Sequence, residues 1–129
     1  MHCIYYNCST ILFKLDPQIR FVGIVNSKGE VVEGGYQEGV EPLLDGQDEQ
    51  IMYMHSLSNM ALLHDLSDKL GNVKYSLIEH QKVVLVTFPL NSDILCLSIS
   101  SGADVEKIKN TIMAIISSTD ITANHNQKQ

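Results

Sequence analysis

The sequence has 129 residues, 44% of them hydrophobic, and a formal net charge of -6 at pH 7. A chain of this length can bury a sizeable core in one domain without disulfides or metals. No apolar run approaches the ~20 residues of a membrane-spanning helix. The acidic balance, with Arg20 as the only arginine, argues against a broad nucleic-acid surface. We therefore expect one domain over residues 1–121, a frayed polar tail at 122–129, and neither membrane nor nucleic acid as a partner.

The first predicted elements are a helix and a β-hairpin. Apolar residues recur at helical spacing before Pro17, which ends the helix: Ile4, Cys8, Ile11, Leu12 and Leu15. Residues 19–25 and 30–36 are typical of two strands, and the four residues 26–29 between them end in a glycine that suits a turn. Gly34-Gly35 and Gly39 give the second predicted strand a weak, bent end.

A long helix and a three-stranded meander follow. Asp45 is a candidate N-cap for a helix that runs to Leu70 and ends at Gly71-Asn72. Three apolar segments with short links predict antiparallel strands over 73–80, 82–90 and 93–100. A last helix is expected after Asp104, over residues 105–119.

Apolar residues cover two sides of the long helix. One side carries Ile51, Met52, Leu62, Leu63, Leu66 and Leu70, and the other carries Tyr53, Met54, Leu57, Met60 and Ala61. A sheet can bury only one of them. We expect the second side, together with Tyr75 and Leu77 of the adjacent edge strand, to bind a second copy of the chain, because aromatic residues and methionine are enriched at interface cores. The opposite assignment, with the leucine side facing the partner, stays open.

Acidic residues are concentrated in one region. Between Glu30 and Asp68 there are nine acidic side chains and no lysine or arginine. We interpret this region as a solvated loop and the start of a helix, and the alternative is a docking face for a basic partner.

The hairpin region resembles a known family. The segments 15–29 (LDPQIRFVGIVNSKG) and 33–36 (EGGY) are similar to those of small archaeal roadblock-like proteins, which are related to longin and profilin-like folds. The resemblance covers about residues 8–100. It implies an α+β fold: a five-stranded antiparallel sheet with a long central helix on one face and terminal helices on the other. It also implies a homodimer, formed by the central helix and the adjoining strand.

No residue pattern in the sequence predicts catalysis. His55 and His64 are nine residues apart and point to different sides of a helix, and His2, Cys3 and Cys8 lack a fourth zinc ligand. Cys96 lies in an apolar strand, where a thiol is usually inert. We expect no catalytic residue, no metal and no cofactor, and cysteines that are thiols in the cytoplasm.

The sequence is compatible with two candidate functions. The first is a non-enzymatic, dimeric interaction module that scaffolds or regulates a partner protein, for which the resemblance suggests a small GTPase. The alternative is a profilin-like or PAS-like sensor that binds a small ligand between sheet and helix.

Overall fold

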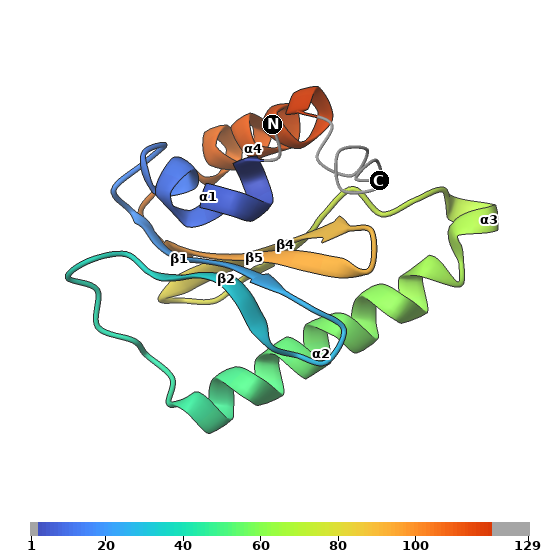
Figure 1. Cartoon of the computed structure of the whole chain (residues 1–129), viewed down its shortest axis with the longest axis horizontal. Coiled ribbons are helices and arrows are strands. Elements are labelled where there is room, and N and C mark those ends of the chain that lie inside the picture. Colours follow the sequence, from blue (N-terminus) through green and yellow to red (C-terminus); the bar gives the residue numbers. More distant parts are fainter. Residues whose placement is uncertain (1–2, 120–129) are drawn as a thin grey trace.

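The computed structural model describes residues 3–119, which form a sheet flanked by helices (Figure 1). The predicted tail at 122–129 lies outside these residues. The elements in chain order are α1 (Cys3–Phe13), β1 (Ile19–Val25), β2 (Val31–Tyr36), α2 (Gly46–His64), α3 (Ser67–Leu70), β3 (Ser76–Glu79), β4 (Val83–Leu90), β5 (Asp93–Ser100) and α4 (Val105–Thr119).

The five strands form one antiparallel sheet in the order β2-β1-β5-β4-β3. Figure 1 shows α1 and α4 on one face of the sheet and α2 on the other. This arrangement confirms the predicted α+β fold, and it places β2 and β3 at the edges of the sheet. Because β1 pairs with β5, the strands β1, β4 and β5 are interior, and their side chains supply most of the core.

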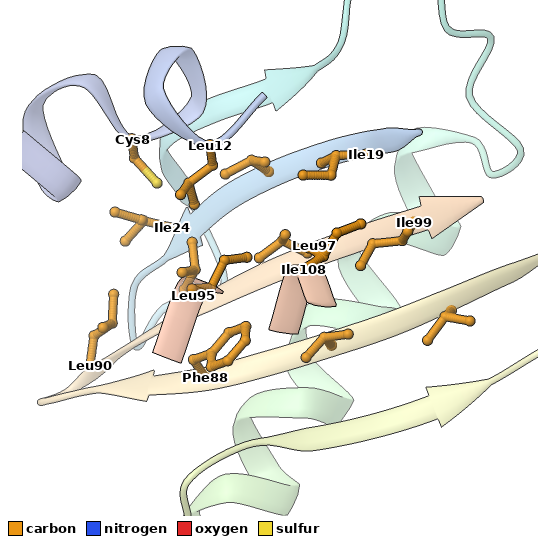
Figure 2. Packing of buried hydrophobic residues seen from close by; sticks show 14 residues of the cluster. Cys8, Leu12, Ile19, Ile24, Phe88, Leu90, Leu95, Leu97, Ile99 and Ile108 are labelled. Atoms are coloured by element: carbon orange, nitrogen blue, oxygen red, sulfur yellow. The ribbon is translucent and has the colours of Figure 1, made fainter. Parts of the chain in front are cut away.

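The main core lies between the sheet and the helices α1 and α4 (Figure 2). The residues of β4 alternate between half-buried and buried, because successive side chains of a strand point to opposite faces and only one face lies in this core. Leu12 of α1, Phe88 of β4 and Ile112 of α4 are almost fully buried in this core. The apolar spacing of the first helix therefore did predict its buried side, although the helix is interrupted at Asn7 (φ -133°, ψ 38°).

A second, smaller core lies beneath α2. Its buried members are Val25, Met60 and Ile94, against which the half-buried residues Tyr53, Leu57, Val73 and Cys96 pack. It covers only part of that face of the sheet, since the residues of β4 that face α2 remain half-buried. One face of the domain is thus closed by two helices, and the other is only partly closed by one.

The predicted helix to Leu70 is two helices. Asp45 caps α2, because its side chain accepts a hydrogen bond from the Asp48 amide at 2.8 Å. The helix ends at His64, and Leu66 leaves helical geometry (φ -99°, ψ 5°) before the single turn of α3. Gly71, at φ 85°, ends α3 as expected.

The predicted strand over 73–80 is also shorter, and only Ser76–Glu79 pair with β4. Ser76 pairs with Thr87, so residue 74 would lie opposite Pro89 if the pairing continued. Proline has no amide hydrogen to donate to a neighbouring strand. This explains why the ladder ends there and why the edge strand is not the long, flat strand that the sequence suggested.

Candidate interaction surface and adjacent cavity

The side of α2 that faces the sheet is the aromatic and methionine side. Met60 is 9% exposed and packs with Val25 and Ile94, and Tyr53 and Leu57 pack against the same cluster. Met60 is therefore buried within the domain and not exposed as expected, whereas Tyr53 and Leu57 are half-buried and a partner role for them stays a prediction. These three side chains form the contact between α2 and the small core.

The β1–β2 turn fixes the orientation of α2. Gly29 is buried at φ 84°, and a Cβ atom there would lie 2.5 Å from the Met54 sulfur and 2.7 Å from the Gln50 amide nitrogen. The Met54 side of the helix thus faces the hairpin. The opposite side, with Met52 and Ser56, faces Val83 and Leu85 of β4.

Large apolar side chains remain exposed along the outside of α2 and on the β3 edge. We call the following set the apolar edge surface: Ile51 (61% exposed), Leu62 (61%), Leu66 (43%), Leu70 (75%) and Ile78 (54%). Ile78 pairs with Leu85 and so lies on the α2 face of the sheet. On the leucine side of the helix, which was the open alternative, the domain leaves Ile51, Leu62, Leu66 and Leu70 exposed, whereas Met52 faces β4.

The remaining residues predicted to bind a partner are divided between surface and core. Met54, Ala61 and Leu77 are exposed, so a partner role for them stays a prediction. Tyr75 is half-buried against the main core, and its ring lies 6.3 Å from that of Phe88.

Lys109 of α4 holds Tyr75 in place. Its ammonium lies 4.6 Å from the centre of the Tyr75 ring and donates hydrogen bonds to the Tyr75 hydroxyl (3.1 Å) and the Glu106 carboxylate (3.2 Å). The bond to Tyr75 raises the pKa of Lys109, so the lysine is charged throughout the physiological range. Tyr75 therefore contributes to the packing of α4 on β3 and β4.

A cavity of about 390 Å³ lies between α2 and the sheet, next to the apolar edge surface. Its floor is formed by small side chains of β4 and β5, namely Thr87, Cys96 and Ser98, and its walls include Phe21, Met52 and Tyr53. Leu43 and Leu44 of the preceding loop close one side. The sequence analysis gave a small ligand between sheet and helix only as the alternative function and did not identify the floor residues of β4 and β5. The small residues at alternate positions 96, 98 and 100 of an otherwise apolar strand were a usable signal.

Charged residues lie at the rim of the cavity. Arg20 donates a hydrogen bond to the Glu41 carbonyl at 2.9 Å, and Lys82 follows the β3–β4 turn. Glu49, the one carboxylate among the described lining residues, accepts a hydrogen bond from the Tyr36 hydroxyl. Burial and the neighbouring Glu49 raise the pKa of Tyr36 to about 12, so its phenol stays protonated at neutral pH.

Cys96 does not have the environment of a nucleophile. Burial raises the pKa of its thiol to about 12, which leaves almost no thiolate at neutral pH.

Within residues 3–119, no three His, Cys, Asp or Glu side chains are grouped so that they could hold a metal ion. In the same part of the chain, none of the helices has the length and apolar character needed to cross a membrane.

Several solved structures share this fold. The domain superimposes on a Roadblock/LC7 domain from Streptomyces avermitilis with a TM-score of 0.65 and 14% identity, covering 87% of this chain and 91% of that chain. The gliding protein MglB from Thermus thermophilus gives a TM-score of 0.70 at 13% identity, covering 95% and 88%. MglC from Myxococcus xanthus gives 0.57 at 13%, covering 96% and 99%.

These similarities confirm the roadblock-like fold that the hairpin segments suggested. At such low identities they establish the fold alone. No curated protein matches the sequence significantly. The model of one protein family, described as a family of unknown function (DUF6659), matches residues 3–119. Because that match spans nearly the whole chain, the protein belongs to the DUF6659 family, and its domain has the roadblock-like fold.

Proposed function

We propose that this domain is a non-enzymatic interaction module of the cytoplasm. It forms a homodimer through the apolar edge surface, and the dimer scaffolds or regulates a partner protein, specifically a small GTPase. The observation that carries the proposal is that five large apolar side chains are exposed along α2, the link after it, α3 and β3. Apolar patches of this kind on a small domain mark protein contact sites.

The two sheet edges differ in how they are protected. The β2 edge is irregular, because its pairing with β1 shifts register between Ile24 and Val25. It is also tied to α1, since the Ser9 amide donates to the Glu33 carboxylate at 3.4 Å. The β3 edge has no such cover among the described residues, and an uncovered edge can pair with another strand. Two copies joined at β3 would continue the sheet and bring their α2 helices together.

A known structure of the same fold supports self-assembly. MglB has been described in a tetrameric arrangement, and that chain matches this one with a TM-score of 0.71 at 14% identity, covering 95% of this chain and 88% of that chain. An isologous dimer at β3 and α2 is the simplest assembly that covers the apolar edge surface of both copies.

Charges placed in this surface should separate the dimer. The purified chain is expected to have twice the monomer mass in light scattering. The double variant Leu62→Glu, Ile78→Glu is expected to be monomeric, with a dissociation constant raised about a hundredfold or more, because each carboxylate would be buried without a partner.

Val32→Glu on the β2 edge is the matched control, because Val32 is exposed to a similar degree. It should leave the mass unchanged. Circular dichroism checks that the double variant is folded. A monomeric wild type, or a folded double variant that is still a dimer, would contradict the proposed interface.

The partner is tested with purified small GTPases from the source organism, loaded with GDP or with a non-hydrolysable GTP analogue. We expect the wild-type dimer to bind one nucleotide state at least tenfold more tightly than the other, since a regulator must have different affinities for the two states. Binding by the monomeric double variant should be weaker. Equal affinity for both states, or no binding in calorimetry, would remove the GTPase from the proposal while leaving the dimer in place.

A further inference from the structure

The cavity beneath the N-terminal half of α2 has the construction of a ligand site. Its volume of about 390 Å³ lies in the range of small-molecule pockets, about 300 to 1,000 Å³. It is not a packing defect of the small core, because that core fills the space under the C-terminal half of the helix with Leu57 and Met60. At the other end the strands present Ser98 and Thr87, whose small side chains leave the space open.

The walls of the cavity suit a flat apolar group. The rings of Phe21 and Tyr53 are stacked at 6.2 Å with an interplanar angle of 23°. The Tyr36 ring meets Phe21 edge-on at 5.0 Å. Aromatic side chains prefer such offset and edge contacts with further rings. Met52 and Leu85 add apolar surface around them.

The rim of the cavity suits a negative charge. Arg20, the only arginine of an acidic chain, lines it together with Lys82. Among residues 3–119, neither side chain forms an ion pair with a carboxylate, and Arg20 uses a guanidinium nitrogen only for the Glu41 carbonyl. The Glu49 carboxylate also lines the cavity and keeps its negative charge while it accepts a hydrogen bond from the Tyr36 hydroxyl, so the two cations outnumber the one anion at the rim. Within the described part of the chain, the two cations beside the aromatic cavity therefore have no carboxylate partner.

We propose that this cavity binds a small aromatic organic acid, with its ring between Phe21, Tyr53 and the β4–β5 floor and its carboxylate bound by Arg20. An arginine binds a carboxylate with two parallel hydrogen bonds, which gives orientation as well as affinity. This inference goes beyond the proposed dimer, because the site is formed within one copy of the chain. Ligand binding at the base of α2 would couple a small molecule to the helix that carries the apolar edge surface.

The test uses 8-anilinonaphthalene-1-sulfonate, an aromatic anion that fluoresces when it enters an apolar site. We expect saturable binding by the wild type. 2-Naphthoate should displace the probe about tenfold more effectively than the neutral analogue 2-naphthalenemethanol, because a hydrogen bond to a charged group contributes about that factor. Equal displacement by the two compounds, or no binding of the probe, would overturn the proposal.

Two kinds of variant locate the site. Arg20→Gln should remove the preference for the acid but keep the displacement by the neutral analogue, and Lys107→Gln on α4 is the charge control that should change nothing. Ser98→Leu should fill the cavity and abolish probe binding, and Thr87→Leu is a second filling variant in case the first does not fold. A preference that survives Arg20→Gln, or binding that survives a folded filling variant, would refute the site.

The same titration separates this site from the dimer interface. The monomeric variant Leu62→Glu, Ile78→Glu should bind the probe like the wild type, because neither residue lines the cavity. If the signal instead falls as the protein concentration rises into the range of dimer formation, a second copy covers the cavity and the ligand site is wrong. Failure of the dimer would be seen in light scattering and would leave the probe result unchanged.

Discussion

Gly34→Ala is expected to lower the free energy of unfolding by about 3 kcal/mol or more, which is a large effect for a single substitution. Gly34 has a φ of 108°, in a region that side chains rarely adopt, and an added Cβ would overlap the Val22 carbonyl oxygen of β1. Because the obstacle is backbone, no side-chain rotation relieves it. The two strands of the hairpin would have to separate.

Urea unfolding followed by circular dichroism measures the effect. Gly46→Ala is the matched control, since no atom lies within 4 Å of its added Cβ and its φ is not in the left-handed region. That change is expected to be neutral or slightly stabilising, because alanine favours a helix more than glycine does. A Gly34→Ala variant as stable as the wild type would show that β2 can shift away from β1 at little cost.

Phe88→Ala is expected to lower the free energy of unfolding by about 3 to 5 kcal/mol. Phe88 is 1% exposed and lies in the main core, where it contacts the ring of Tyr75. Removal of the ring leaves a cavity between β4 and α4 that the surrounding strands cannot close. Since small domains have a total stability of about 5 to 15 kcal/mol, the variant should be close to unfolding at 37 °C.

Val32→Ala on the exposed β2 edge is the comparison, and it should change stability by less than about 0.5 kcal/mol. Both proteins are measured at one fixed concentration, because dimer formation would add to the apparent stability. A loss at Phe88 no larger than that at Val32 would mean that the ring is not part of a rigid core.

The local features of the sequence predicted the fold well. The bounds of β1 and β5, the cap at Asp45 and the start of α4 after Asp104 are as expected. The two caps depend on interactions within a few residues, such as the bond from the Lys107 amide to the Asp104 carboxylate at 3.1 Å, and the two strands coincide with apolar segments whose limits are visible locally. Sequence patterns that span only a few neighbouring residues can be recognised without knowing the rest of the structure. Elements whose ends depend on a neighbour, such as β3 opposite Pro89, were predicted too long.

The orientation of α2 could not be predicted in this way. The helix has apolar residues on both sides, so its hydrophobic period does not say which side is buried. The choice depends on distant residues. Met60 fits between Val25 and Ile94, and Met54 fits against Gly29, which has no side chain to exclude it. As a result the leucine side, with Ile51 and Leu62, is the exposed one.

The candidate cavity depends still more on tertiary structure. Its residues come from β1, β2, the loop before α2, α2 itself, the β3–β4 turn, β4 and β5, and no single sequence pattern spans these segments. By itself the sequence determined the elements, their order and the existence of an unpaired apolar helix side, because those follow from local spacing and burial. Only the tertiary structure decided which side is exposed and that Arg20 lies beside an aromatic cavity, because both result from packing between residues far apart in the chain.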